Sequence, residues 1–347
     1  MPAQLLADTD FFIKFALTEP KHTKLMLHTC LFSVPFALAM AILPQSCNGS
    51  TPQGKGAKDE LLLPLSASDT ICDAQHMDDA NSICERIVFT KYDSTKVEQL
   101  LSVTPAGNDV LFYARQFKGI PYVASTLEMC DPEKLVVNLR ELDCTTLVET
   151  CMALAMTHRQ GNTRFVDFCK NLESIRYRCG KMNGYLSRLH YFTWWMHDNI
   201  SKGIIQEVKD TKHFIAPICV NNHYMSSHPK KYKMLRIHPE WVDSIRTLEK
   251  ASNGQDGCYL AERFTGLTKR DLSCIENGDV IAIVTRKEGI DYSHLGIAVW
   301  QNDGHLHLLN ASSIHHKVVE EPKTLKTYLS EHPSSIGIRV FRLIRTE

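Results

Sequence analysis

The chain has 347 residues, of which 44% are hydrophobic and 22% charged, so it can form one large domain or two modest ones. Lysine plus arginine and aspartate plus glutamate both number 39, which gives a formal net charge of zero. This balance and the lack of a basic tract argue against nucleic acid as a partner. They favour a small or neutral substrate.

The twelve cysteines lack the regular spacing of a disulfide framework, and no Cys-x-x-Cys pair indicates zinc or redox chemistry. We expect most of them to be free and buried, including Cys151, Cys169 and Cys219, which stand among apolar residues. Cys72 and Cys84 could pair if the protein is exported. No cluster of His, Cys and carboxylates at ligand spacing predicts a metal site, and we expect no cofactor.

Residues 25–43 form the only long apolar run, with lysines before it and Cys47 after it. The pattern predicts that residues 1–47 are an export signal or a lipoprotein-type anchor. An uncleaved membrane-spanning helix is the alternative, because about 19 apolar residues are enough to cross a bilayer. Residues 48–85 have the polar composition of a linker. We therefore expect an exported protein that is periplasmic or tethered to a membrane.

Cys144 stands at the predicted start of a helix. The apolar residues after Asp143 follow helical spacing as far as Gly161. Asp143 suits the N-cap, and Gly161 suits the position just past the end. A thiol in the first turn meets unpaired N–H groups and the positive end of the helix dipole, which favour thiolate and can face an oxyanion. Cys144 is thus the candidate nucleophile, against the alternative of an ordinary buried thiol.

The C-terminal part is rich in strand patterns, at residues 278–285, 293–300, 305–312 and 336–344. His294 opens the second of these strands, and Asn310 lies near the end of the third, beyond a turn at 301–304. We expect a bulge at Gly304 to place Asn310 directly across from His294, where it would orient the imidazole. In the other register Asn310 faces away, and His307 is the alternative orienting residue.

A long insert separates the candidate nucleophile from the β-rich region. Helical patterns at 165–200 lead us to expect that this insert, about residues 162–270, is largely helical. Arg188, His190 and Tyr191 lie close to two tryptophans. We expect this stretch to wall a substrate cleft, with Arg188 bound to a substrate carboxylate. The alternative is a solvated arginine beside core tryptophans on an amphipathic helix.

Taken together, these residues resemble the N-acetylmuramoyl-L-alanine amidase-like family within the NlpC-type papain-like cysteine hydrolases. The resemblance covers roughly residues 90 to 347 and rests on GIPYVASTLE, VVNLRELDCTTLVE, SRLHYFTWWMHDN, NGDVIAIVTRKEGIDYSHLGIAV and LHLLNASS. It implies an α+β fold for residues 86–347, with a papain-like core in which the nucleophile helix packs on an antiparallel β-sheet.

The resemblance also implies site residues. Cys144 would attack an amide carbonyl, His294 would act as base and then acid, and Asn310 would orient the imidazole at a position where the family commonly has His. Tyr122 matches a tyrosine that helps to line the oxyanion site, although a half-buried packing role is the alternative. Ser293 and Asp143, which adjoin the base and the nucleophile, are further candidates for substrate contact.

The implied reaction is hydrolysis of an amide bond in peptidoglycan fragments through a thioester, with the muramoyl–L-alanine bond favoured. Two enzymatic alternatives use the same thioester: a stem-peptide endopeptidase that cuts D-glutamyl–diamino acid bonds, and an acyl transferase. A third alternative is a non-catalytic cell-wall-binding module that keeps the fold.

Overall fold

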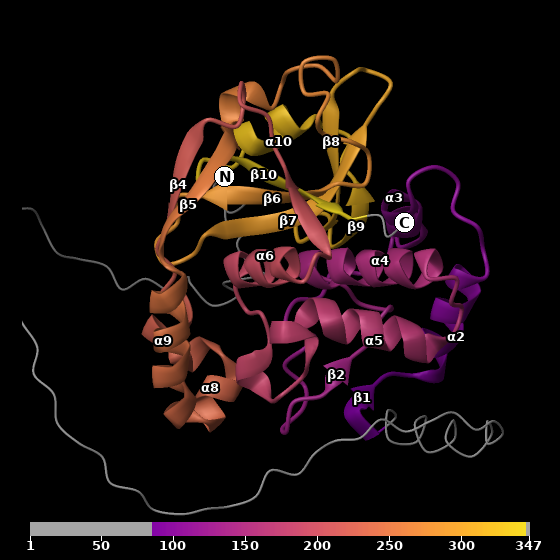
Figure 1. Ribbon diagram of the computed structural model, residues 1–347, viewed down its shortest axis with the longest axis vertical. Helices are drawn as coiled ribbons and strands as arrows, with labels where there is room; N and C mark the ends of the chain where they lie inside the picture. Colours follow the sequence, from indigo (N-terminus) through magenta and orange to yellow (C-terminus); the bar gives the residue numbers. More distant parts are fainter. Residues whose placement is uncertain (1–84, 345–347) are drawn as a thin grey trace, which may run out of the picture. The chain divides into compact units, whose positions relative to one another are not determined.

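The computed structural model describes residues 85–344 (Figure 1). The predicted signal or anchor, and the predicted linker apart from its last residue, lie outside the described residues. Within the described part, no helix is both long and apolar enough to cross a bilayer.

An antiparallel sheet forms the centre of the fold, in the order β4-β5-β10-β6-β7-β8-β9, with β3 also paired to β10. Its strands are β3 (Ile205–Val208), β4 (Ala216–Val220), β5 (Gly254–Ala261), β6 (Val280–Thr285), β7 (Tyr292–Trp300), β8 (Leu306–Ser312), β9 (Lys317–Glu320) and β10 (Ser335–Leu343). Every residue of β6, β7 and β8 is buried. Such continuously buried strands are covered on both faces of the sheet. The predicted antiparallel sheet is confirmed.

Helices cover the two faces of this sheet (Figure 1). The helix α4 (Cys144–Arg159) packs on β7 and β8, and α5 (Phe165–Arg176) packs behind α4. The short α10 (Leu325–Ser330) packs on β8 and β10. Alternate residues of β6 serve the two layers: Val280 joins the hydrophobic cluster that contains α4, whereas Ile281 joins the cluster that contains α10.

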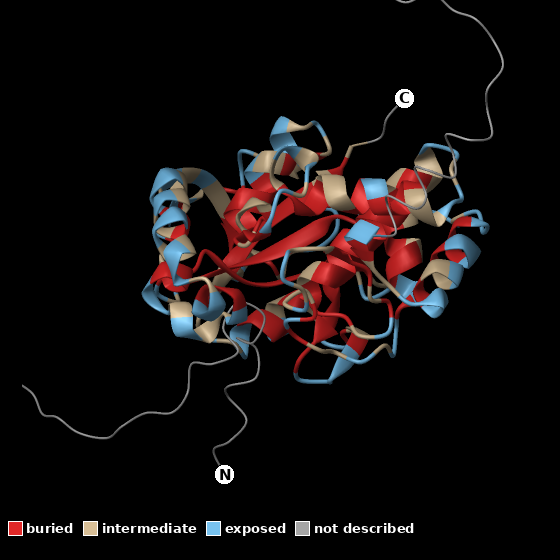
Figure 2. Ribbon diagram, turned by 90° about the horizontal axis from the view of Figure 1, so that it is seen from below, coloured by how far each residue is buried: buried red, intermediate tan, exposed pale blue. Residues whose placement is uncertain are grey.

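The remaining elements surround this core. Figure 2 shows buried strands inside a shell of more exposed helices. Most residues of α4 are also buried. The N-terminal elements are β1 (Ile87–Val88), α2 (Lys91–Leu101), α3 (Asp109–Gln116) and β2 (Leu135–Val136), and β1 and β2 form a separate parallel pair. The segment after α5 contains α6 (Phe192–Ser201), α7 (Tyr224–Ser227), α8 (Lys233–Ile237) and α9 (Val242–Ser252).

The predicted insert is mainly helical, but it also contributes strands that the sequence did not predict. Its strands β3, β4 and β5 all join the main sheet. Their partners are distant in sequence: Val208 pairs with Val340, and Leu260 pairs with Ile338. Short strands that are stabilised by such long-range pairing leave little local signal.

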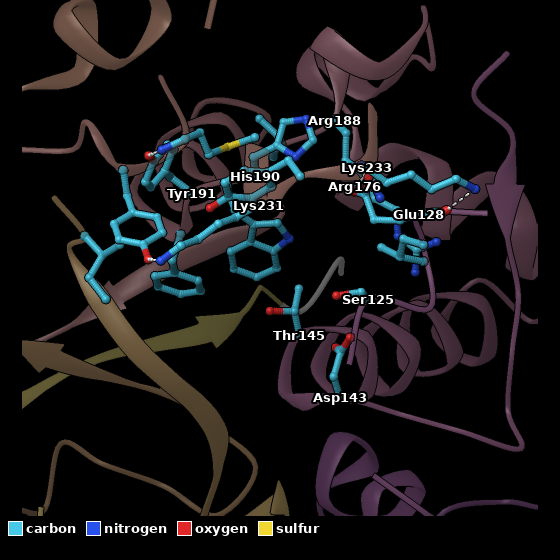
Figure 3. A pocket seen from close by; sticks show the side chains of 18 of the residues that line it. Ser125, Glu128, Asp143, Thr145, Arg176, Arg188, His190, Tyr191, Lys231 and Lys233 are labelled. Atoms are coloured by element: carbon cyan, nitrogen blue, oxygen red, sulfur yellow. Dashed lines mark hydrogen bonds and ion pairs between the residues drawn. The ribbon is translucent and has the colours of Figure 1, made fainter. Parts of the chain in front are cut away.

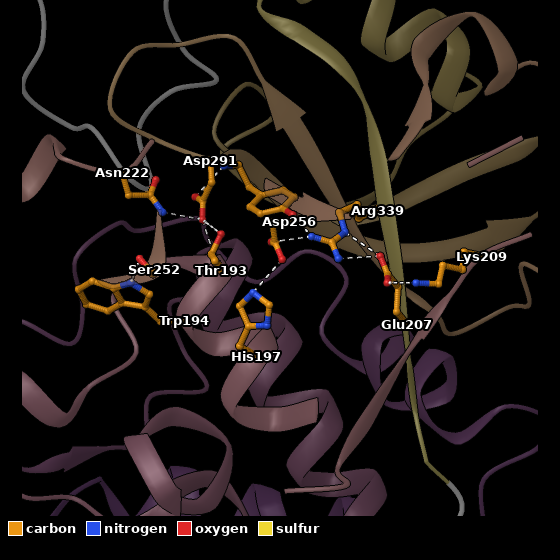
Figure 4. Close-up of polar contacts among 11 residues, drawn as sticks. Thr193, Trp194, His197, Glu207, Lys209, Asn222, Ser252, Asp256, Asp291 and Arg339 are labelled. Atoms are coloured by element: carbon orange, nitrogen blue, oxygen red, sulfur yellow. Dashed lines mark hydrogen bonds and ion pairs between the residues drawn. The ribbon is translucent and has the colours of Figure 1, made fainter. Parts of the chain in front are cut away.

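Buried polar contacts tie the insert to the sheet (Figure 4). Asp291 accepts a hydrogen bond from the Thr193 N–H at the start of α6, at 2.9 Å. Burial raises the pKa of Asp291 above its ordinary value. On β10, Arg339 donates to Glu207 at 2.7 Å and to Asp256 at 2.9 Å. The insert is therefore an integral part of the fold.

The eight cysteines within residues 85–344 are all free. Cys151 and Cys169 are buried, as expected, but Cys219 is exposed and that prediction is wrong. Cys219 lies on β4, at the edge of the sheet, where alternate side chains face solvent.

Candidate active site

The helix α4 begins at Cys144, as predicted, with Asp143 as its N-cap. Asp143 Oδ1 accepts from the Thr146 N–H at 2.8 Å, and Thr146 Oγ1 accepts from the Asp143 N–H at 2.9 Å. The helix ends before Gly161, whose φ of 72° is readily adopted by glycine. This reciprocal cap fixes Cys144 in the first turn of a helix that is buried in the core.

Cys144 is fully buried and lies beside β7. Burial raises the pKa of its thiol well above the usual range, and the charge of Asp143 raises it further. Hydrogen bonds from the Leu295 N–H and from Thr145 act in the opposite direction. Burial outweighs the helix start, contrary to the expectation that this position favours thiolate, so the thiol needs a base to lose its proton. The contact with Leu295 places it next to the residue that follows His294.

His294 and Asn310 are hydrogen-bonded side chains on adjacent strands: His294 Nε2 lies 3.0 Å from Asn310 Oδ1. Both are buried. The register of β7 and β8 differs from the predicted one, because Trp300 pairs with Leu306. If this pairing is continued along the strands, Asn310 lies opposite Gly296. The expectation of direct pairing is therefore wrong by two residues. The two side chains still meet diagonally, because an even shift keeps them on one face of the sheet.

The competing orienting residue, His307, makes other contacts. Its Nδ1 lies 3.0 Å from the Glu321 carbonyl oxygen, and its Nε2 lies 2.9 Å from Asp303. These contacts hold His307 within the β8–turn region, and the imidazole of His294 is oriented by Asn310.

Two further predicted residues flank the centre. Ser293 is the extra residue of a bulge on β7, since Ile283 pairs with His294 whereas Val284 pairs with Tyr292. A bulge redirects the side chains around it, which here include His294. The backbone of Tyr122 forms a bridge to Leu142, two residues before Cys144. Tyr122 thus lies beside the segment that leads into the nucleophile helix.

A cavity of about 380 Å³ opens next to the N-terminus of α4. Asp143 and Thr145, the two neighbours of Cys144, line it. In the view of Figure 3 they lie with Ser125 on one side, opposite His190, Tyr191 and Lys231. The cavity volume lies in the range of small-molecule binding sites.

Arg188 lines the cavity, and its side chain is buried and paired with carboxylates of the protein. Its side chain is 6% exposed and forms ion pairs with Glu128 at 2.5 Å and with Glu133 at 3.4 Å. Its guanidinium also lies over the Tyr185 ring, 4.9 Å from the centroid. The alternative of a solvated arginine is therefore wrong, whereas contact between Arg188 and a substrate carboxylate stays a prediction.

His190 and Tyr191 also line the cavity and are held by internal hydrogen bonds. His190 Nε2 lies 2.9 Å from the Tyr185 carbonyl oxygen. Burial and the nearby Arg188 lower the pKa of His190 well below its ordinary value, so the ring is neutral and donates this bond. The Tyr191 hydroxyl donates to Glu249 at 2.7 Å. These contacts fix the positions of the two side chains in the cavity wall.

Several charged residues line the cavity besides those that were predicted from the sequence. Two ion pairs in the cavity wall neutralise their own charges. One joins Arg188 and Glu128, and in the other Arg176 Nε lies 2.7 Å from Glu149 Oε2. The other charged lining residues are Asp143, Lys231, Lys233 and Arg236. This rim of three cations suits an anionic ligand. Among the described residues, no group of His, Cys and carboxylates is arranged to hold a metal ion.

A sequence model of the AmiA-like family, described as N-acetylmuramoyl-L-alanine amidase-like, matches residues 113–338. The chain belongs to this family. The match spans about two thirds of the chain and includes the cap of α4, the cavity and the strands β7 and β8. No curated protein matches the chain significantly.

Solved structures agree with membership of the AmiA-like family. An N-acetylmuramoyl-L-alanine amidase from Bacteroides uniformis is 37% identical with a TM-score of 0.63, over 71% of this chain and 99% of that one. A candidate xylanase from Bacteroides fragilis is 40% identical with a TM-score of 0.62, over 67% and 100%. A Legionella pneumophila protein is 22% identical with a TM-score of 0.55, over 79% and 97%, and supports the fold alone.

Proposed function

We propose that this protein is a cysteine amidase that hydrolyses an amide bond in peptidoglycan fragments, with the muramoyl–L-alanine bond as the favoured target. The observation that carries the proposal is the arrangement of Cys144 at a helix start, against the strand that carries His294, with Asn310 hydrogen-bonded to the imidazole. The order of nucleophile helix, base strand and orienting strand is that of papain-like enzymes, and we assign the core to the NlpC-type class on this basis.

In the proposed reaction His294 donates its Nε2–H to Asn310, which leaves Nδ1 as the proton acceptor. Nδ1 takes the proton of Cys144 as Sγ attacks the amide carbon, because the buried thiol does not ionise by itself. N–H groups of the first turn of α4 stabilise the oxyanion. The protonated imidazole gives its proton to the leaving amine, and water then cleaves the thioester with His294 as base again.

The cavity and its charges support the substrate class. Muropeptides carry carboxylates, and the cavity that starts beside Cys144 is lined by Lys231, Lys233 and Arg236, which form no ion pair within the described part of the chain. The family match and the Bacteroides uniformis amidase support the same class. Glycoside hydrolysis, which the name of the Bacteroides fragilis relative implies, has less support. It needs two available carboxyl groups, whereas Glu128 and Glu149 are each paired with arginine.

The experiment is digestion of a muramoyl peptide by wild type and Cys144→Ala, with products identified by mass spectrometry. An amidase releases the whole stem peptide, whereas an endopeptidase releases only its distal end. We expect the wild type to release the whole peptide and Cys144→Ala to lose the activity. Full hydrolysis by Cys144→Ala would overturn the nucleophile assignment. Binding of muropeptides by the wild type without turnover would instead establish a wall-binding module.

We also propose that residues 1–47 export the protein or tether it to a membrane, which would place the enzyme where peptidoglycan lies. The pattern of an apolar run followed by Cys47 supports this proposal. Metabolic labelling with a fatty acid, compared between wild type and Cys47→Ala, tests the lipoprotein form of it. Label that is retained in Cys47→Ala would exclude lipidation at this residue.

A further inference from the structure

Glu321 follows β9 and lies directly behind the His294–Asn310 pair. Its side chain is 3% exposed. Its Oε1 accepts from Asn310 Nδ2 at 3.1 Å, and its Oε2 lies 3.2 Å from His315 Nε2. Its main chain is also fixed, since its N–H donates to the Leu308 carbonyl at 2.8 Å. The carboxylate is therefore held with one oxygen on the amide that orients the candidate base.

The direction of this chain of hydrogen bonds has a chemical consequence. Asn310 Nδ2 donates to Glu321, so the NH₂ group of the amide is turned toward the carboxylate. The amide oxygen then faces His294, and an oxygen can only accept, so the proton of the neutral imidazole lies on Nε2. In this tautomer Nδ1 carries the lone pair and is the atom that can accept a proton.

We propose that Glu321 is a positioning residue for the reaction, which sets the tautomer of His294 through the amide of Asn310. The inference rests on the proposed function, in which His294 is the base for Cys144. A neutral amide alone offers both a donor and an acceptor, and a rotation of the amide by 180° would exchange them. Glu321 removes this ambiguity, because the rotated amide would present its oxygen to a carboxylate.

The test compares Glu321→Leu, which removes the acceptor, with Glu321→Gln, which retains one oxygen that can face Asn310. For Glu321→Leu we expect kcat to fall about ten- to a hundredfold with KM nearly unchanged, as for other partners that orient a functional imidazole. For Glu321→Gln we expect kcat within about threefold of wild type, because the same hydrogen bond can form. Glu320→Gln is the matched control, since Glu320 binds Arg115 and Lys118 on the surface.

A double-mutant cycle separates positioning from a structural role. If Glu321 acts through the amide, Glu321→Leu should lower kcat strongly in the wild type and hardly at all in Asn310→Ala. Thermal unfolding checks that each variant is folded. If Glu321→Leu does not fold, Glu321→Asp replaces it in the same cycle, since its shorter side chain keeps the charge but withdraws from the amide.

Two results would overturn the inference: a folded Glu321→Leu or Glu321→Asp variant with kcat within about threefold of wild type, or an equal loss of kcat with and without Asn310. Failure of the proposed function looks different, because Cys144→Ala would then keep the activity of the wild type. Each variant is therefore compared in the same muramoyl-peptide assay with Cys144→Ala as the reference for complete loss.

Discussion

Asp143 and Thr146 exchange two hydrogen bonds across the first turn of α4, and this cap holds a carboxyl group in the core beside the candidate nucleophile. Asp143 Oδ1 is bonded to Thr146, whereas Oδ2 is buried without a hydrogen-bond partner. Burial raises the pKa of Asp143 from 3.8 to about 7. The ionised form of this cap is therefore disfavoured in the folded protein, and stability must depend on pH.

We predict that Asp143→Asn removes part of this dependence. Between about pH 3.8 and pH 7 the unfolded chain releases a proton that folded Asp143 retains. The stability due to the protonated form is fully present below this window and is lost as pH rises through about 7. In that window the unfolding free energy of the wild type should fall, relative to the variant, by up to about 1.4 kcal/mol per pH unit.

Urea unfolding of wild type and Asp143→Asn at several pH values measures this difference. Asparagine can still accept the Thr146 N–H bond, so the cap itself is kept. Alkylation gives a second readout: the negative charge of Asp143 raises the pKa of Cys144, so the variant should react faster with iodoacetamide at pH 8. If the free energy of unfolding changes with pH in the same way for the two proteins, the prediction is wrong.

A second prediction concerns the buried ion pair of Arg176 and Glu149. Both side chains are 3% exposed, and Arg176 also donates to the Val136 carbonyl at 2.7 Å. Glu149→Gln leaves the arginine charge buried without its counterion, so we expect a loss of about 3–5 kcal/mol in unfolding free energy. Arg86→Ala is the control, because Arg86 forms an ion pair with Glu173 but its own side chain is half exposed. We expect this substitution to lower the free energy of unfolding by at most about 1 kcal/mol. Chemical unfolding measures the free energy of unfolding of both variants. Equal losses would show that burial does not increase the contribution of the Arg176–Glu149 ion pair to stability.

The local elements of the site could be predicted from the sequence, since their signals are local. Asp143 and Gly161 bracket the helix α4, and the apolar runs on either side of the 301–304 turn are the strands β7 and β8. For His294 and Asn310, the sequence predicts that both side chains lie on the same face of the sheet, but it does not predict the register. The register depends on how many residues the turn takes up, and the hairpin alone contains no unambiguous signal for that number.

Interactions between distant segments could not be predicted. Arg188 finds Glu128 60 residues away, and Glu207 meets Arg339 132 residues away. Glu321 also gave no signal, because an acidic residue after a strand is ordinary in composition. The role that we infer for Glu321 depends on the pairing of β9 with β8, which places Glu321 beside Asn310. Tertiary packing decides which charges are compensated, and the pattern along the chain does not contain this information.

A third prediction separates Lys233 from Arg188 within the same cavity. Lys233 is exposed at the rim of the cavity, and its Nζ donates to the Glu128 main-chain carbonyl at 3.2 Å. We expect Lys233→Met to raise KM for a muramoyl peptide several-fold, with kcat and stability nearly unchanged, because it removes an uncompensated charge. Arg188→Met should instead lower the unfolding free energy by about 3–5 kcal/mol, since it leaves the buried side chain of Glu133 beside Glu128 without a counterion.

Steady-state kinetics and thermal unfolding of both variants check this separation. A rise in ionic strength should reduce the difference in KM between wild type and Lys233→Met, because salt screens exposed charges. An Arg188→Met variant that is as stable as wild type and binds substrate more weakly would instead show that Arg188 contacts the substrate directly.

The last prediction concerns the close approach of β7 and β8 at Gly296. A Cβ at this position would lie 2.5 Å from Leu308 Cδ1 and 2.9 Å from the Leu309 carbonyl oxygen. Because a backbone atom is involved, Gly296→Ala must separate the two strands that carry His294 and Asn310. We expect a loss of about 1–3 kcal/mol in unfolding free energy and a fall in kcat that exceeds any change in KM.

Gly304→Ala in the turn of the same hairpin is the control for this substitution. A Cβ there meets nothing within 4 Å, although the φ of 77° strains an alanine. It should therefore lower stability by about 1 kcal/mol while kcat stays close to that of wild type. Equal effects of the two substitutions on kcat would mean that general weakening of the hairpin is responsible. A selective effect of Gly296→Ala would show that the spacing of β7 and β8 sets the geometry of the His294–Asn310 pair.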